Sequence, residues 1–464
     1  MRKIPGVGFI FFIVVSLLAT LLFSHQVTTA RVTQNYSPTA CPASANSGVV
    51  TAALPNKKVQ IHDVFASKKV LKYRSAGAIS HQIGKSPLLV AGNSGTTFAI
   101  QTKSSTWTGA TICTAGISDS WFIGGTADIT SQSYLSLVNS GLSDAVIDVV
   151  VYSEKGSLAK LSYTVKQSSQ KDIRLDSIAP GSSALALHLI TRTGRITSYL
   201  FDERKKGLRT YGGDYVNAQL FSSPTLFIAG IPTSLNMTQQ STSTNSNTTT
   251  KNKKNSKTNA IKVKHILRIM NAGDIKTTAT VQVSNSQSVI TPIGLNAINL
   301  APGIVREIAL DGDLGEGSFG AKISADQNLV ASIYTYFESQ SFREFLWSTP
   351  SQSAAELASG PIRLNLGGLE PTLTLVSDKI DVVISWTNNK GKVSSKTFHE
   401  SDFLQWRVPA NTRQLVITRT PRGASLSGGA LTWRGASGIA FLPLKSGSIL
   451  DTATKPISNA ATIS

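Results

Sequence analysis

The stretch that decides the fold is Tyr134-Leu-Ser-Leu-Val-Asn-Ser-Gly-Leu-Ser-Asp-Ala-Val-Ile-Asp-Val-Val-Val-Tyr152, because the chain contains the same pattern twice. The second copy is Ile266-Leu-Arg-Ile-Met-Asn-Ala-Gly-Asp-Ile-Lys-Thr-Thr-Ala-Thr-Val-Gln-Val283, in which Asn271 stands 132 residues after Asn139. Each copy predicts a strand, an Asn-x-Gly turn and a β-branched strand with period-two alternation. We expect the turn glycine to adopt positive φ and the Asn side chain to bond its own main chain. Two copies of one unit predict repeated β domains, but they do not by themselves predict any chemistry.

Other short patterns recur in the same order around the two copies. The first copy is opened by Trp121-Phe-Ile-Gly-Gly and followed by Ile178-Ala-Pro-Gly, and the second has Leu226-Phe-Ile-Ala-Gly and Leu300-Ala-Pro-Gly at these places. Pro before Gly presets a tight turn, so we expect a change of strand direction at both sites. A more divergent third copy has its central strand at Asp381-Val-Val-Ile-Ser-Trp. These patterns predict an all-β chain of tandem antiparallel β-sandwich domains, Ig-like or fibronectin-like, behind an N-terminal hydrophobic helix.

Length and pattern together divide the chain into segments. The 464 residues leave room for about three domains. We predict a signal anchor or signal peptide (1–30), a flexible stalk (31–58), β domain 1 with an N-terminal β segment (59–220), β domain 2 (221–352), β domain 3 (360–446) and a disordered tail (447–464). The segment 233–260 is rich in Thr, Ser, Asn and Lys, and the repeat places it inside the second domain. It is too polar to pack, so we expect a disordered loop there.

The N-terminus has the pattern of an export signal. Arg2 and Lys3 precede residues 6–23, an apolar run without a charge. As a helix this run would span about 27 Å, which is short for a hydrocarbon core of roughly 30 Å. Thr28-Thr29-Ala30 is an imperfect cleavage site, so a cleaved signal peptide and an uncleaved anchor both stay open. Either alternative predicts that the remainder is extracytoplasmic, attached to the cell membrane or secreted.

The chain has two cysteines, Cys41 and Cys113. An even count in an exported chain predicts that they form a disulfide, with two unpaired thiols as the alternative. Closing a loop of about 70 residues would stabilise the fold by roughly 4 kcal/mol. Neither cysteine lies in a Cys-x-x-Cys pattern, so nothing here supports redox catalysis or a zinc site.

Charge points to an anionic partner. The formal net charge is +19, from 45 basic and 26 acidic residues, which favours contact with an anionic cell-wall polymer or a membrane surface. Two groups are candidate polymer contacts: Arg204, Lys205, Lys206 and Arg209 in one segment, and Lys251, Lys253, Lys254 and Lys257 in the polar loop. The structural alternative for the first group is a domain connection that turns at its glycines. The structural alternative for the second group is a solvated loop. A nucleic-acid partner conflicts with export and has no recognition motif.

Several of these patterns resemble a known family when they are taken in order. They are Trp121-Phe-Ile-Gly-Gly, the Leu-Val-Asn-x-Gly turn, Ala-Pro-Gly and Asp202-Glu-Arg-Lys-Lys-Gly-Leu-Arg-Thr-Tyr-Gly-Gly-Asp-Tyr-Val216. The chain resembles, over roughly Cys41 to Leu444, an actinobacterial family of exported proteins described only as a domain of unknown function, DUF5719. Its Cys41-Pro-Ala departs from the family's Cys-Pro-Gly. The resemblance implies a cell-envelope protein targeted by its N-terminus, and it implies no activity or catalytic residue.

The residues themselves show no catalytic pattern. Asp311-Gly-Asp-Leu-Gly-Glu316 lacks the spacing of a calcium-binding EF-hand and predicts a turn between strands. The six histidines stand singly, and His188 lies in an alternating strand where a structural role is expected. The tryptophans could line a sugar-binding face, but their positions in or beside strands favour core packing. We therefore predict no catalytic residue, no metal and no cofactor.

These observations lead to two hypotheses about function. The first is a non-enzymatic cell-envelope protein, an extracytoplasmic β-sandwich scaffold or a module that contacts wall polymer. The alternative is an accessory subunit or atypical hydrolase that acts on envelope glycan, with its site between domains. The alternative requires two facing carboxylates in a cleft, for example Asp202 or Asp214 facing Asp176.

Overall fold

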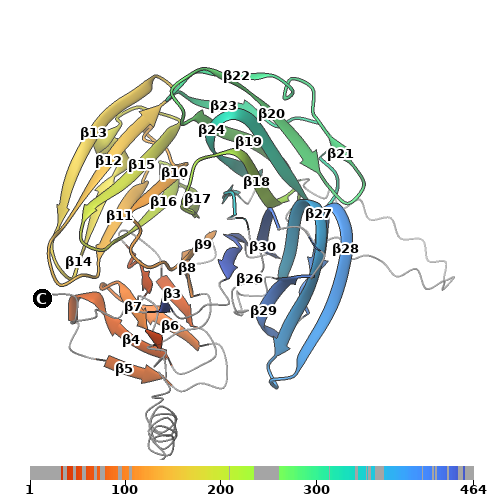
Figure 1. Ribbon diagram of the computed structural model, residues 1–464. Helices are drawn as coiled ribbons and strands as arrows, with labels where there is room; N and C mark the ends of the chain where they lie inside the picture. Colours follow the sequence, from red (N-terminus) through yellow and green to blue (C-terminus); the bar gives the residue numbers. More distant parts are fainter. Residues whose placement is uncertain are drawn as a thin grey trace, which may run out of the picture. The chain divides into compact units, whose positions relative to one another are not determined.

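Figure 1 shows the structure, a computed structural model. The chain separates into two units. The first comprises residues 1–35 and 450–464, and the second comprises residues 36–449. The described residues are 33–34, 39–447 and 453–454, apart from gaps at 45–48, 55–58, 67–69, 74–78, 92–96, 104–106, 208, 235–260, 313, 340–342, 352, 354–356, 361–369, 410, 421–422, 424–425 and 436–437. In the first unit, β1 (Thr33–Gln34) pairs antiparallel with β33 (Ala453–Thr454). The predicted export segment 1–30 lies outside the described residues.

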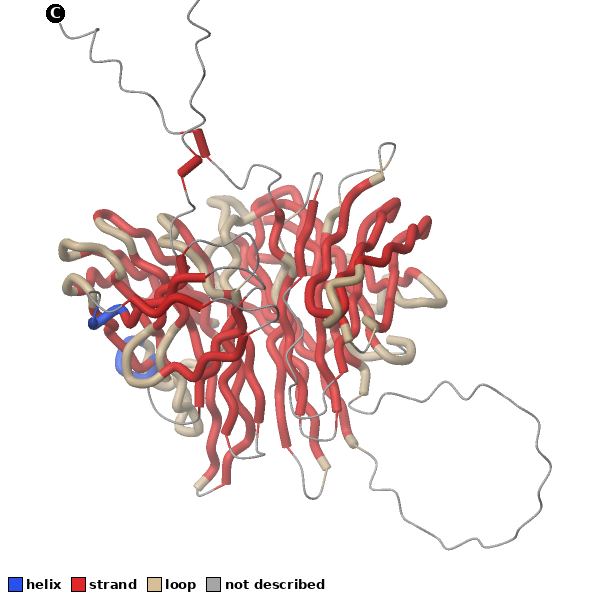
Figure 2. Tube along the Cα trace, turned by 90° about the horizontal axis from the view of Figure 1, so that it is seen from below, coloured by secondary structure: helices blue, strands red, loops and turns tan. Residues whose placement is uncertain are grey.

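The chain is all-β, as the alternating patterns predict. Strands form nearly all of the regular structure in Figure 2, and they pair antiparallel. The helices in the described ranges are the single-turn η1 (Val64–Ala66) and α2 (Leu175–Ile178). Nowhere in those ranges is there a helix with the length and apolarity that crossing a bilayer requires.

Two four-stranded sheets come first in the second unit. One has the order β2 (Thr39–Cys41), β7 (Leu88–Ala91), β4 (Val59–Asp63) and β5 (Val70–Tyr73); the other has β6 (Ile79–Ile83), β3 (Val49–Leu54), β8 (Phe98–Lys103) and β9 (Trp107–Ile112). The segment predicted to be a flexible stalk, 31–58, therefore contributes β2 and β3, and the structure differs from the expectation there. Ala40 and Val50 are each only 1% exposed, so apolar burial fixes a segment whose Ser, Thr and Pro content suggested a linker.

The first repeat also forms two four-stranded sheets. Their orders are β10 (Asp119–Ile123), β15 (Leu185–Thr193), β12 (Ala145–Ser153), β13 (Gly156–Val165), and β14 (Ser169–Arg174), β11 (Tyr134–Asn139), β16 (Ile196–Lys206), β17 (Arg209–Val216). One hydrophobic cluster joins the two sheets, because Val149 and Leu187 from one sheet pack with Leu135 and Leu200 from the other. Alternation along each strand thus produces one apolar face per sheet.

The second repeat forms one eight-stranded sheet. Its main order is β21 (Val289–Ile290), β20 (Thr277–Ser284), β24 (Ser318–Glu338), β19 (Lys262–Asn271) and β23 (Val305–Ala309), and β18 (Ser223–Pro232), β25 (Arg343–Ser348) and β22 (Ile298–Leu300) pair beside this path. In the first repeat β15 and β16 are separate strands, with Gly194 at φ +84 between them. In the second repeat, the 21-residue β24 pairs with β20 through its first half and with β19 through its second half.

The last sheet has seven strands. Its order is β31 (Gly438–Pro443), β30 (Gly428–Gly435), β27 (Glu370–Asn388), β29 (Thr412–Arg419), β26 (Leu357–Gly360) and β32 (Lys445–Gly447), with β28 (Val393–Arg407) paired to β27. The predicted central strand at Asp381 lies inside β27. The domain boundaries proposed from sequence stay predictions, and most of the polar loop 233–260 lies outside the described residues.

Both Asn-x-Gly stretches have the same hydrogen bonds. Asn139 ends β11, and its Nδ2 donates to the carbonyl four residues later at 2.9 Å and to Val165 O at 3.0 Å. Asn271 ends β19, and its Nδ2 donates to the carbonyl four residues later at 2.7 Å and to Leu300 O at 3.4 Å. In each turn the Asn Oδ1 accepts the N–H of the glycine two residues later. The two asparagines therefore have equivalent roles.

The turn glycines do not have the positive φ that the pattern predicts, since neither Gly141 nor Gly273 is among the residues with positive φ. They are required for space instead. A Cβ on Gly141 would lie 3.0 Å from Asn139 Oδ1. A Cβ on Gly273 would lie 3.2 Å from Asn271 Oδ1 and 2.5 Å from Gln327 Oε1. The glycine leaves room for the Asn side chain to fold over the turn. The Pro-Gly turns do adopt positive φ, +75° at position 181 and +67° at position 303.

Four strands from different sheets close a cycle of contacts within the second unit. β9 contacts β17 and β31, and β25 also contacts β17 and β31. Their approach depends on small residues: a Cβ on Gly213 of β17 would lie 2.8 Å from the Trp107 ring of β9. Gly212 has φ +127°, and its Cβ would lie 2.8 Å from the Phe345 ring of β25. The family-like segment of β16 and β17 is therefore placed where several sheets meet.

Candidate functional site

The segment Asp202–Val216 forms most of an antiparallel hairpin. β16 pairs with β17, Asp202 lies opposite Asp214, and Gly207 has φ +60° in the turn. From the sequence, the structural alternative for this segment was a connection into the second repeat. The structure places it within the first repeat's second sheet, and the chain passes to β18 only after Val216.

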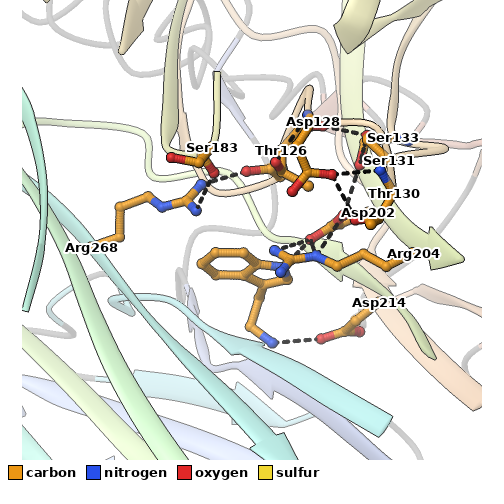
Figure 3. Close-up of polar contacts among 12 residues, drawn as sticks. Thr126, Asp128, Thr130, Ser131, Ser133, Ser183, Asp202, Arg204, Asp214 and Arg268 are labelled. Atoms are coloured by element: carbon orange, nitrogen blue, oxygen red, sulfur yellow. Dashed lines mark hydrogen bonds and ion pairs between the residues drawn. The ribbon is translucent and has the colours of Figure 1, made fainter. Parts of the chain in front are cut away.

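The hairpin contributes a buried ion pair at the centre of Figure 3. Asp202 is fully buried, and its Oδ2 accepts from Arg204 Nη2 at 3.0 Å. Asp202 Oδ1 accepts from Ser133 Oγ at 2.7 Å, and Oδ2 also accepts from Trp347 Nε1 at 2.9 Å. Burial lowers the pKa of Arg204. The charge of Asp202 and its hydrogen bond raise that pKa by more than burial lowers it, so the net shift is upward. The Asp202 carboxylate is thus satisfied by Arg204 of the same strand, by Ser133 just before β11 and by Trp347 of β25.

Two more carboxyl groups are buried beside this pair. Asp214 accepts from the backbone N–H groups of Tyr215 and Trp347, both at 2.8 Å. Burial raises the pKa of Asp214 well above its usual range. Glu344 Oε1 accepts from Thr108 N at 3.2 Å and from a backbone N–H of β31 at 3.4 Å, and burial raises its pKa to about 8. These carboxyls join strands, and none of the three points into an open cleft.

A second arginine connects the two repeats. Arg268 of β19 is 1% exposed, and it donates to Gly125 O at 2.5 Å and to Ser183 O at 3.1 Å, both in the first repeat (Figure 3). Its Nη2 also donates to Glu307 at 2.6 Å. Burial lowers the pKa of Arg268, and Glu307 opposes that shift. Arg268 lies 4.9 Å from the centroid of the Trp347 ring, and Arg204 lies 6.0 Å from the same centroid, so this tryptophan lies beside both arginines.

The structure separates the predicted polymer contacts into different environments. Arg204 pairs with Asp202, and Lys205 lies 3.7 Å from Glu203, which also pairs with Lys103 at 2.8 Å. Arg209 is exposed on β17, and the side chain of Lys206 is not described. Lys251, Lys253, Lys254 and Lys257 lie outside the described residues. The strand therefore partly neutralises its own basic cluster through ion pairs between residues two positions apart.

A pocket of about 290 Å³ opens beside Arg204. Its wall is built from two cross-strand pairs of β19 and β24, in which Lys264 lies opposite Tyr336 and Ile266 lies opposite Tyr334. Tyr334 and Tyr336 are stacked, with ring centroids 6.4 Å apart and an interplanar angle of 12°. The lining is completed by Thr130, Arg204 and Tyr211. No carboxylate is among these lining residues.

The aromatic rings hold the cations at the pocket. The guanidinium of Arg204 lies 4.5 Å from the Tyr334 ring centroid. Arg343 lies 4.6 Å from the Tyr211 ring centroid and pairs with Glu338 at 2.8 Å. Arg204 presents Nε and Nη2 to Asp202, and within the described part of the chain its Nη1 has no hydrogen-bond partner. The pocket thus combines flat apolar faces with fixed positive charge.

The carboxylates named for the hydrolase alternative are not brought together in a cleft. Asp176 pairs with Arg174 at 2.5 Å on the surface, with both side chains about 40% exposed. Asp202 and Asp214 are buried and share Trp347 as a hydrogen-bond donor. Across the described ranges, no group of three His, Cys, Asp or Glu side chains is placed to hold a metal ion.

The tyrosine pocket is the feature that sequence reasoning missed. Tyr211 and Tyr334 come from different repeats, and the repeat alignment gives no sign that they share a cavity. The available signal was the Tyr-x-Tyr pattern of Tyr334 and Tyr336, which places two rings on one face of a strand. The tryptophans in strands pack in the core as expected: Trp121, Trp347 and Trp433 are buried and Trp386 is half-buried.

The predicted disulfide is confirmed. Cys41 and Cys113 are bonded, with Cα atoms 4.7 Å apart, and both are buried. The bond joins the end of β2 to the residue after β9.

Comparison with known proteins identifies a family for most of the chain. The model of a family of unknown function (DUF5719) matches residues 81–399. Among curated proteins, none matches the chain.

Proposed function

The chain belongs to the DUF5719 family of unknown function, and from that premise and the site above we propose that it is a non-enzymatic cell-envelope protein that contacts an anionic wall polymer. The single observation that carries this proposal is the pocket, which is lined by tyrosines and two cations and by no carboxylate. A formal net charge of +19 supports the same class of partner, because it raises the local concentration of polyanions.

The architecture supports a scaffold outside the cytoplasm. Paired sheets around shared apolar clusters, as in the first repeat, fit tandem sandwich domains of the Ig-like or fibronectin-like kind. A buried disulfide favours an oxidising compartment. The charged start and apolar run of residues 1–30 supply the export signal or anchor in this proposal.

The buried carboxyls favour the scaffold over the hydrolase alternative. A glycosidase needs two carboxyl groups that reach a sugar from opposite sides. Asp202, Asp214 and Glu344 instead accept hydrogen bonds from within the packed strands. These hydrogen bonds hold neighbouring strands and sheets together.

The proposal is tested by sedimenting the purified full-length protein with isolated cell wall. We expect binding at roughly 0.01 M salt and release at roughly 1 M salt, since the screening length falls from about 30 Å to about 3 Å. Cellulose, a neutral polymer, is the control and should not retain the protein at either salt concentration. Absence of wall binding at low salt, or equal binding to cellulose, would contradict the proposal.

A further inference from the structure

The pocket beside Arg204 has the chemistry of a site for one acidic sugar unit. We infer that it binds a pyranose that carries an anionic substituent, a carboxylate or a phosphate. This inference rests on the proposed function, and it adds where on the molecule the polymer is recognised and by which groups. A volume of about 290 Å³ is near the small end of ligand pockets, which suits a single ring and not a long chain segment.

The tyrosines supply the surface for the ring. Tyr336 is half-buried, and it stands beside Tyr334 on the same face of β24 with nearly parallel rings. Tyr211 approaches from β17, so aromatic carbon is offered from two repeats. Flat apolar faces of this kind stack on the C–H face of a pyranose. The Tyr336 hydroxyl already hydrogen-bonds the Glu338 side chain, so this tyrosine offers the face of its ring.

Two cations supply the recognition of the negative charge. Lys264 is exposed on β19 directly opposite Tyr336, and no carboxylate in the described ranges forms an ion pair with it. Arg204 is fixed by Asp202 and by the Tyr334 ring, which leaves its Nη1 edge for a ligand. A guanidinium held in this way loses little freedom on binding and suits the planar geometry of a carboxylate or the oxygens of a phosphate.

Asp202 reduces the net positive charge at the pocket, so the site suits a ligand with a small negative charge. Its carboxylate already balances Arg204, so Lys264 supplies the positive charge that remains at the wall of the pocket. Arg343 is likewise balanced by Glu338. A simple anion lacks the ring contacts, and a neutral sugar lacks the charge contact. The site should therefore select a ligand that has both.

The experiment is isothermal titration of the full-length protein with four probes. They are galacturonic acid, glucose 6-phosphate, galactose and inorganic phosphate. We expect at least one acidic sugar to bind about tenfold more tightly than both galactose and phosphate. The first two probes distinguish a carboxylate from a phosphate as the preferred group. Equal binding of phosphate and the acidic sugars, or no binding of either acidic sugar, would overturn the inference.

Variants locate the binding. Lys264→Gln and Tyr336→Ala should each reduce the affinity for the acidic sugar by about tenfold. Tyr336→Phe should retain the stacking and most of the affinity. Lys390→Gln, in the turn between β27 and β28, changes the net charge equally and should bind as the wild type does. Thermal melts of each variant should match the wild type, because both altered side chains are at least partly exposed.

The outcomes separate this inference from the proposed function. Wall binding that is unchanged in Lys264→Gln and Tyr336→Ala would reject the pocket as the site while the envelope function stands. Acidic-sugar binding that depends on both side chains, in a protein that does not sediment with wall, would reject the proposed function while the pocket stands.

Discussion

At the scale of single residues, the Asp202–Arg204 pair shows how burial changes the contribution of an ion pair to the free energy of unfolding. Asp202→Asn keeps the shape but removes the charge that balances Arg204 in a buried site. We expect a loss of about 3–5 kcal/mol in unfolding free energy, measured by urea denaturation. Asp176→Asn is the matched control, because Arg174–Asp176 is the same pair in an exposed place and should lose less than about 1 kcal/mol. Equal losses in the two variants would contradict this account.

Glu344 makes the stability depend on pH. Its pKa is about 8 in the folded protein and 4.5 when exposed, so between these values the unfolded chain releases a proton that the folded chain keeps. Stability from this group is therefore complete below pH 4.5 and is lost as the pH rises towards 8. Asp214, whose pKa is also raised by burial, acts in the same direction.

The substitution Glu344→Gln should reduce the loss of stability between pH 5 and pH 8, and the measurement is urea denaturation across that range. The amide cannot ionise, and its oxygen can still accept from Thr108 N. Glu316→Gln removes an exposed carboxyl and should leave the slope unchanged. The same slope in Glu344→Gln as in the wild type would show that the buried carboxyl is not the titrating group.

At the scale of secondary structure, the two Asn-x-Gly turns should respond alike to truncation. Asn139→Ala and Asn271→Ala each leave buried carbonyls and a glycine N–H without a partner, so each should cost about 1–3 kcal/mol in a urea denaturation experiment. Asn388 is the control: it accepts from Lys390 N at 2.9 Å in a more exposed turn, and its truncation should cost less than about 1 kcal/mol. A large loss in only one of the first two variants would show that the turns are not equivalent.

The strands and turns could be predicted because their signals are local. Alternation fixed the strands around Val149 and Val281, and Pro-Gly fixed the turns at positions 181 and 303. The role of Gly141 could not be predicted, because positive φ and lack of space for a Cβ give the same residue preference. β2 and β3 were missed because short strands in a Ser- and Thr-rich segment become stable only through partners such as β7 and β8, which lie far along the chain.

At the scale of the whole second unit, the packing of sheets against one another forms the pocket beside Arg204. This packing is the feature that the sequence predicts least well. The composition of the segment Asp202–Val216 predicts a place of interest, and the structure places its second half, β17, in contact with β9 and β25. Its basic residues suggested a surface, but Asp202 and Glu203 on the same strand neutralise two of them. Tyr334 of the second repeat lies over Arg204 because β25, which pairs with β24, packs against β17 of the first repeat. No local pattern encodes that contact.

The disulfide gives a prediction at this same scale, because it closes a loop that contains the whole N-terminal pair of sheets. Cys41 and Cys113 are 72 residues apart, so replacing both by Ala should lower the unfolding free energy by about 4 kcal/mol through the greater entropy of the unfolded chain. β9, which ends next to Cys113, contacts β17 and β31, so the loss should lower the main transition of a thermal melt. The wild type with reductant should match the variant. A separate early transition, with the main one unchanged, would show that the N-terminal sheets unfold independently and that β9 does not couple them to the pocket-bearing strands.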